Sequence, residues 1–363
     1  MATAQPAPDA PPAAAPAVAP TPEPWPDAAT LRERRLKAEA LPLFASEEPL
    51  ALTLQADFKQ VNQNRDRVKK QRFAATLTVK GGDGAPRSIP VTLTTRGKFR
   101  LMARNCDFVP LRVELPKEAA AVAGTPFEGQ SSLKLVTHCQ DSGEYEQYMY
   151  REYLAYRIYN TLTPRSFRAR LADVTYFDTT KGKAVDVRPG IFLETERDVA
   201  RRLEGRKLER KGKVFAQLDA ETLDTMMLFE FLIGNTDFSV MALHNVILVE
   251  DPQRRVYPVP YDFNHSGLVN ARYAIPSPKL RIKTVVERLY RGPCRSPEQL
   301  GPAILHFRDK EKPILSLLDG LPAMAKTDRH QVESYLEEFF DTLRRPGSVK
   351  RHFTEGCPKG GGV

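Results

Sequence analysis

The spacing of apolar residues changes once along this chain of 363 residues, and that change constrains the fold more than any other feature. Up to about residue 196, most segments alternate apolar and polar residues, which is the period of strands with one buried face. The predicted strands span residues 49–58, 72–81, 87–100, 109–115, 131–139, 169–178 and 188–196. A single strong helical pattern, "GEYEQYMYREYLAYRIYNTL" (143–162), interrupts them, and Pro164 ends it.

After about residue 197 the spacing becomes helical. "DAETLDTMMLFEFLIGN" (219–235) has an apolar stripe, and Asp219 is placed to cap its first turn. Further helices are predicted near 279–290, 297–318 and 327–344. The order predicts an α+β chain with a two-lobed plan. Its parts are a β-rich N-lobe with one main helix (28–196) and a mainly helical C-lobe (197–345), with the functional site in the cleft between them.

The two ends of the chain are expected to lie outside these lobes. Residues 1–27 are rich in Ala and Pro, which predicts a disordered tail or linker, and residues 346–363 are expected to form a disordered C-terminal tail. "ATA" followed by "QPAP" resembles a signal-peptide cleavage site, so two interpretations stay open. The protein is secreted or periplasmic if an export signal was lost upstream of Met1, and otherwise it is cytoplasmic. No run is long and apolar enough to predict a membrane span.

Cysteine spacing and charge argue against a structural zinc site and a nucleic-acid-binding surface. The four cysteines contain no CxxC pair, which argues against structural zinc, and Cys106 and Cys139 could pair if the protein is exported. The net charge is +9, with basic clusters at 65–72 and 201–213. Neither cluster has the interleaved aromatic residues of a base-stacking surface, so no nucleic-acid partner is predicted.

Three polar residues surround a short apolar hairpin in "NTDFSVMALHNVILVEDPQRRVYPVPYDFNHSG" (235–267). The hairpin places Asn245, at the start of its first strand, beside Asp262, just after its second. An amide and a carboxylate oxygen are ligands that suit Mg²⁺ bound with water and phosphate. Asp237, in the preceding loop, can face an incoming nucleophile as a catalytic base. Together the three predict phosphoryl-transfer chemistry.

Such a site also needs a cation for the phosphates and a place for the nucleotide base. Lys134, in the strand-like "SSLKLVTHC", is the candidate cation, and Glu152 on the following helix is its expected partner, with Glu144 and Glu146 as weaker candidates. The backbone around Glu194 and Thr195 is expected to serve the adenine edge.

Four segments in this order resemble the CotH-type, or spore-coat-kinase-like, branch of the protein-kinase-like fold. The segments are "VTLTTRGKFR", "SLKLV" with the helix after it, "RPGIFLETERDVARR", and "GNTDFSVMALHNVIL" with "VYPVPYDFNHSG". The resemblance implies ATP with Mg²⁺ or Mn²⁺, Asp237 as the base, Lys134 and Glu152 at the phosphates, and Asn245 and Asp262 as metal ligands. The chain departs from the family at two points: Asp237 and Asn245 stand eight residues apart, farther than in the usual kinase loop, and there is no G-x-G-x-x-G loop, since "KGGDG" (80–84) is as short as a simple turn.

The sequence therefore predicts a CotH-like kinase that transfers the γ-phosphate of ATP to a hydroxyl on a protein or a small molecule. Two alternatives remain open. One is a pseudokinase-like module that binds nucleotide with little or no catalysis, and the other is a cell-envelope protein that uses the same surfaces to bind partners.

Overall fold

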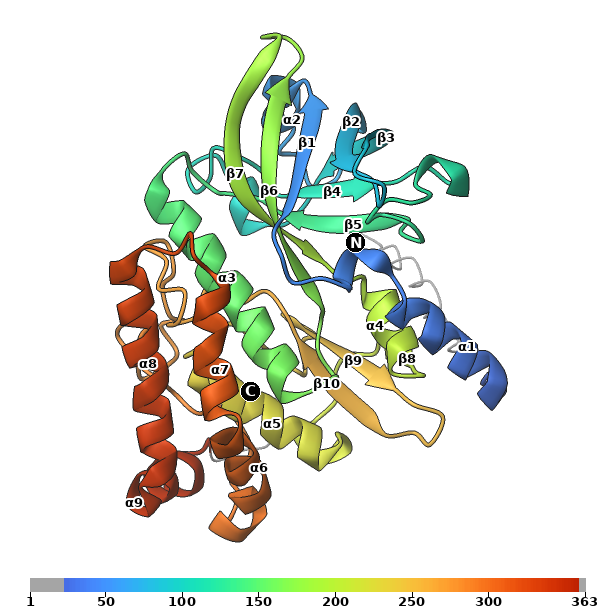
Figure 1. Ribbon diagram of the computed structural model, residues 1–363. Helices are drawn as coiled ribbons and strands as arrows, with labels where there is room; N and C mark the ends of the chain where they lie inside the picture. Colours follow the sequence, from blue (N-terminus) through green and yellow to red (C-terminus); the bar gives the residue numbers. More distant parts are fainter. Residues whose placement is uncertain (1–22, 359–363) are drawn as a thin grey trace, which may run out of the picture.

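The first half of the chain forms a closed β-barrel in the computed structural model, which describes residues 23–358 (Figure 1). Around the barrel the strand order is β1-β2-β3-β4-β5-β7-β6. The parallel pairing of β1 with β6 closes it, and every other pair is antiparallel. The strands are β1 Leu50–Ala56, β2 Phe73–Lys80, β3 Pro86–Thr95, β4 Leu111–Glu114, β5 Ser132–Val136, β6 Ala169–Asp178 and β7 Lys183–Leu193.

The barrel overturns the predicted fold class. A two-lobed protein-kinase-like fold would have an open sheet in its first part, and this prediction is wrong because the sheet closes on itself. The alternation of apolar residues identified the strands but carries no information about their partners. Leu50 pairs with Ala172 and Ala56 with Asp178, so closure depends on contacts between segments more than 100 residues apart.

The alternating apolar residues of the strands fill the barrel. Leu54, Leu77, Leu93, Val113 and Leu133 are fully buried and belong to one apolar cluster. A closed barrel has no free sheet edge, so its apolar face is enclosed on all sides.

Helix α3 (Gly143–Leu162) crosses the middle of the molecule and contacts both the barrel and the helices beyond it (Figure 1). Its bounds are those predicted from its sequence pattern. Tyr156 and Tyr159 are almost completely buried and pack on Phe263 and Phe229 of the second half of the chain. The aromatic side chains of this helix are therefore core residues that join the two halves.

The second half consists of helices around a three-stranded sheet of order β10-β9-β8 (Figure 1). The sheet is formed by β8 Arg206–Leu208, β9 Val246–Glu250 and β10 Val256–Pro260. Asp219 caps α5 as expected, accepting a hydrogen bond from the backbone N of Thr222 at 2.9 Å. Besides α3, the α-helices of the first 202 residues are α1 Ala28–Glu39, α2 Phe58–Gln63 and α4 Glu196–Arg202. Those of the second half are α5 Ala220–Leu232, α6 Pro297–Asp309, α7 Glu311–Ser316, α8 Lys326–Arg344 and α9 Pro346–Val349.

Two predictions about the second half are wrong. Residues 279–290 form turns instead of a helix, because Arg288 anchors the segment by hydrogen bonds to the backbone of Leu232 and Tyr335. Residues 346–358 are not a disordered tail. They form α9 and a π-helical segment, Lys350–Glu355, whose Phe353 is fully buried.

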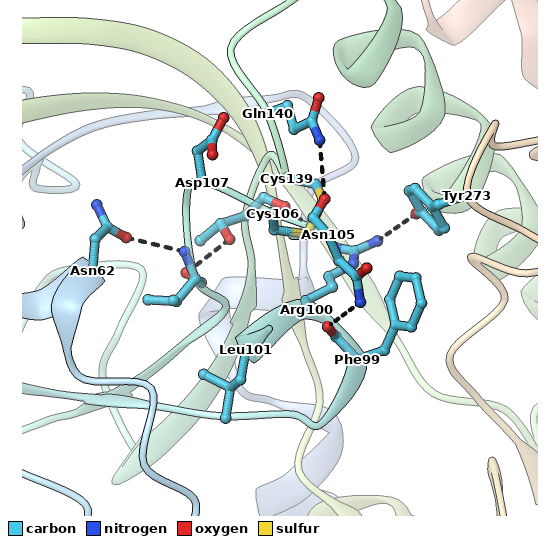
Figure 2. The surroundings of a disulfide bond; sticks show 12 residues. Asn62, Phe99, Arg100, Leu101, Asn105, Cys106, Asp107, Cys139, Gln140 and Tyr273 are labelled. Atoms are coloured by element: carbon cyan, nitrogen blue, oxygen red, sulfur yellow. Dashed lines mark hydrogen bonds between the residues drawn. A yellow bond between two sulfur atoms is a disulfide. The ribbon is translucent and has the colours of Figure 1, made fainter. Parts of the chain in front are cut away.

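Two disulfides join Cys106 to Cys139 and Cys294 to Cys357. The first links the loop before β4 to the residues that follow β5 (Figure 2). It is the pairing that the sequence allowed for an exported protein. The second ties the C-terminal segment to the loop before α6. The expected N-terminal tail lies almost entirely in residues 1–22, outside the described residues.

Candidate active site

One cavity of about 340 Å³ brings together the five side chains predicted to form the phosphoryl-transfer site. It lies between one end of the barrel, α3 and the base of the β9–β10 hairpin. Its lining includes Lys134, Glu152, Asp237, Asn245 and Asp262. Segments from four distant parts of the sequence thus meet at one concave site.

The hairpin positions Asn245 and Asp262 as the sequence indicated. Val246 pairs with Pro260, and the backbone N of Tyr261 donates to the backbone O of Asn245 at 2.9 Å. Both polar residues have left-handed backbones, with φ of 53° at Asn245 and 65° at Asp262. Asn and Asp adopt this conformation more readily than other residues with a Cβ, which is one physical reason for their presence at these two points.

The eight-residue interval between Asp237 and Asn245 does not separate them. Ser239 and His244 form a β-bridge that folds the intervening residues into a tight loop. The Asn245 amide N then donates to the backbone O of Asp237 at 2.7 Å and to its Oδ2 at 3.2 Å. The long loop is therefore compatible with a compact site.

Asp237 is held as a carboxylate by its neighbours. His244 Nε2 lies 3.0 Å from Asp237 Oδ1. Burial alone would raise the pKa of Asp237, but the hydrogen bond from His244 and the nearby His265 bring it below its ordinary value. The same contact raises the pKa of His244. Asp237 is thus ionised at neutral pH, as a proton acceptor or a positioning group must be.

Asp262 and Arg96 are charged groups of the cavity without a protein partner, and Lys98, which also lines it, has none within residues 23–358. Within residues 23–358, neither the Asp262 carboxylate nor the Arg96 guanidinium forms a hydrogen bond or an ion pair. The backbone N of Asp262 donates a hydrogen bond to the Tyr156 hydroxyl oxygen at 2.9 Å, which orients the residue. Unpaired groups of opposite charge in one cavity are suited to a ligand that carries both an anion and a cation.

Lys134 has a different partner from the one predicted. Its Nζ lies 2.8 Å from Glu196 Oε1 and 4.8 Å from the centre of the Tyr261 ring. Burial lowers the pKa of Lys134, and Glu196 opposes that shift. Burial would also raise the pKa of Glu196, but Lys134 and Lys207 lower it to about 2. Because the ionised Glu196 carboxylate lies 2.8 Å from the amine, it favours the charged form of Lys134.

Glu152 pairs with Arg100 instead, at 3.2 Å between Oε2 and Nη2. Burial raises the pKa of Glu152 to about 7, although Arg100 opposes the change. The predicted Lys134–Glu152 ion pair is therefore absent from the structure. Both side chains still line the cavity, each fixed by a residue that the sequence did not single out for that role.

Glu194 and Thr195, expected at the adenine edge, do not line the cavity. Glu194 is fully buried and forms ion pairs with Arg168 and Arg202. Thr195 caps α4 by accepting a hydrogen bond from the backbone N of Asp198. The adjacent Leu193 is the residue of this segment that lines the cavity.

The sequence did not identify Arg100 and Glu196, and for Arg96 it favoured a salt-bridged strand residue over a phosphate contact. Three further residues thus contribute to the cavity and its ion pairs: Arg96, Arg100 and Glu196. The first two stand in "TTRGKFR", where a tight turn at Gly97 (φ 94°) brings them to the barrel edge. The "KGGDG" segment, by contrast, is the turn between β2 and β3 and does not line the cavity.

The donor set fits Mg²⁺ held mainly by phosphate and water. Asp262 offers an unpaired carboxylate, and Asn245 donates through its amide nitrogen, which leaves its Oδ1 as an acceptor. One or two protein oxygens are typical of such sites. Residues 23–358 contain no group of three or more His, Cys, Asp or Glu side chains arranged to hold a metal.

No protein-family model matches the chain, and no curated protein matches its sequence. Across the part of the chain that the structure describes, no helix has the length and apolar character required to cross a membrane.

Proposed function

We propose that this protein is an ATP- and Mg²⁺-dependent phosphotransferase, with site residues like those of the CotH-type family, that phosphorylates a hydroxyl group on a protein or a small molecule. One observation carries the proposal. A single cavity combines a cationic side, Arg96 and Lys134, with an oxygen-rich side, Asp237, Asn245 and Asp262. Phosphoryl transfer needs this pairing, because catalysis depends mainly on positioning and on neutralising charge.

The cationic side chains and the oxygen donors of the cavity have different tasks in the proposed reaction. Asn245 and Asp262 would hold Mg²⁺, which supplies positive charge next to the phosphates when bound. Arg96, which has no protein partner within residues 23–358, is free to bind phosphate oxygens in a bidentate manner. Glu196 fixes Lys134, and the Arg100–Glu152 pair supports the loop that carries Arg96.

Asp237 would act on the acceptor. As the acceptor oxygen forms its bond to the γ-phosphorus, the bond between that phosphorus and the oxygen of the departing ADP breaks. The acceptor hydroxyl loses its proton to the Asp237 carboxylate, whose lowered pKa keeps it ionised beforehand. His244 and Asn245 hold the carboxylate in place during this step.

Two measurements on the full chain test the proposal: Mg²⁺-dependent ATP binding, and autophosphorylation or transfer to an added acceptor. Asp237→Ala should reduce transfer by about 10²–10⁴-fold, the usual contribution of a general base, while ATP affinity changes little. Glu337→Ala, an exposed carboxylate on α8, is the matched control and should transfer phosphate normally.

The outcomes separate the alternatives. ATP binding without transfer in the wild type would identify a nucleotide-binding module with little catalysis. The absence of any Mg²⁺-dependent ATP binding would contradict the phosphotransferase proposal and favour a partner-binding role.

A further inference from the structure

A second cavity, of about 410 Å³, lies at the other end of the β6–β7 hairpin. Leu193, which lines the candidate active site, pairs with Ala169, whereas Tyr176 and Asp186, which line the second cavity, pair near the hairpin turn. The remaining walls come from α2, from the loop after Cys106 and from the residues after β5. The second cavity is therefore a separate site that the proposed reaction does not use.

Four aromatic rings form one wall of this cavity: Phe58, Phe108, His138 and Tyr176. Ring centres are 4.4 Å apart for Phe108 and His138, 4.7 Å for Phe108 and Tyr176, and 5.2 Å for Phe58 and Tyr176. Such a wall offers stacking and edge-to-face contacts to another flat ring.

Two polar side chains in this wall have no partner. Tyr176 is 1% exposed and His138 is 5% exposed, and neither the Tyr176 hydroxyl nor the His138 Nδ1 forms a hydrogen bond within residues 23–358. Buried polar groups are nearly always hydrogen-bonded, so an unpaired donor and acceptor beside a cavity indicate a ligand with polar atoms.

The interior of the cavity is close to electrically neutral. Burial and the nearby Arg188 lower the pKa of His138 to about 4, so its imidazole is uncharged at neutral pH. At the rim, Asp141 and Asp186 pair with Arg188, and Asp178 accepts hydrogen bonds from its own turn. Lys59, Asp107 and Lys181 also line the cavity, with exposed side chains that form no ion pair within residues 23–358. Beside the rings themselves the buried polar groups, Tyr176 and His138, are uncharged, and a charged ligand would lose hydration there.

We propose that this cavity binds a small uncharged aromatic compound that carries a hydroxyl or a ring N–H group, of the phenol or indole class. Its ring would pack against Phe58 and Phe108, and its polar group would bond to Tyr176 or His138. The volume falls within the range of known small-molecule sites. The proposal does not depend on phosphoryl transfer.

The Cys106–Cys139 disulfide, drawn in Figure 2, joins the two segments that carry Phe108 and His138 of this aromatic wall. His138 directly precedes Cys139, and Phe108 follows Cys106 by two residues. The backbone N atoms of Asp107 and Phe108 both donate to the backbone O of Cys139, at 2.9 and 3.2 Å. Asn62 Oδ1 also accepts a hydrogen bond from the backbone N of Val109, which joins α2 to the same loop. Loss of the disulfide should therefore separate the rings and weaken binding.

Titration of the full chain with p-cresol, indole and toluene, followed by NMR, tests the proposal. We expect p-cresol and indole to bind to the wild type, with nuclear Overhauser contacts to the Tyr176 ring. Tyr176→Phe should weaken p-cresol about fivefold, the effect of one hydrogen bond between uncharged groups, and should leave toluene unchanged. Replacing both Cys106 and Cys139 by Ser should weaken all three probes. The matched control, with Cys294 and Cys357 both replaced by Ser, should bind them normally.

Three results would overturn the proposal. The first is the absence of contacts between p-cresol and Tyr176 in the wild type, a measurement that needs no variant to fold. The second is equal binding in the two disulfide variants. The third is binding of benzoate or benzylamine as tight as that of p-cresol, which would exclude an uncharged ligand class.

Discussion

The two ends of the β9–β10 hairpin each carry an aspartate, and the two residues differ in their partners. At the turn, Asp251 accepts hydrogen bonds from the backbone N of Arg255 at 2.9 Å, from Arg255 Nε at 2.8 Å and from the Tyr257 hydroxyl at 2.8 Å. At the open end, the Asp262 carboxylate accepts none within residues 23–358. Asp251 therefore stabilises the hairpin, whereas Asp262 is available for a ligand.

The largest contrast should appear in nucleotide binding. Asp262→Ala should weaken Mg²⁺-dependent ATP binding about 10–100-fold, because it removes a charged oxygen ligand. Asp251→Ala, the same change at the turn end, should leave the affinity nearly unchanged. Calorimetric titration with and without Mg²⁺ measures both. Equal losses in the two variants would show that Asp262 acts through hairpin stability and that the metal assignment is wrong.

Arginines at or near the two ends of the hairpin extend the comparison. Arg96 faces the cavity without a partner within residues 23–358, and Arg255 pairs with Asp251 at the turn. We expect Arg96→Ala to weaken ATP binding about tenfold through the loss of charge-assisted hydrogen bonds, and Arg255→Ala to have no effect on it. A normal affinity in Arg96→Ala would remove this residue from the phosphate site.

The free energy of unfolding should depend more on Asp251 than on Asp262, the reverse of the order expected for nucleotide binding. Asp251→Ala should lower the free energy of unfolding by about 1 kcal/mol, because it leaves the buried Tyr257 hydroxyl without its partner. Asp262→Asn should leave stability nearly unchanged, since the carboxylate forms no hydrogen bond or ion pair within residues 23–358 and Asn also adopts the left-handed backbone of this position. Urea denaturation followed by circular dichroism measures both. A larger loss in Asp262→Asn would contradict the division between the two ends.

Local patterns predicted the elements of the fold but not their assembly. The bounds of α3 and β6 match the predicted segments, because their periodicity and the Pro residue between them are local signals. Barrel closure depends on the pairing of β1 with β6, which no local pattern encodes.

The same limit applies to the site. The hairpin made the proximity of Asn245 and Asp262 predictable, since a hairpin brings its own ends together. The partner of Lys134 was not predictable in the same way. Lys134 pairs with Leu193 across β5 and β7, which places Glu196, at the start of α4, within reach of its amino group. Only the strand order reveals this proximity, whereas the local sequence favours Glu152, on the helix that follows β5, as the partner of Lys134.

The smallest expected effect is on the titration of His244, and it tests the contact that holds Asp237. The hydrogen bond to Asp237 raises the pKa of His244 above its ordinary value, and nearby Lys98 opposes this. The stabilising contribution of the contact is thus complete below the unfolded-state pKa of about 6.5 and is lost as the pH rises through the higher folded-state pKa. In an NMR titration, Asp237→Asn should lower the pKa of His244, Lys98→Ala should raise it, and Asp251→Asn should leave it unchanged. Shifts of opposite sign from two neighbours cannot come from a general loss of stability. An unchanged pKa in Asp237→Asn would mean that His244 does not hold the carboxylate in solution, and Asn245 alone would then have to position the proposed base.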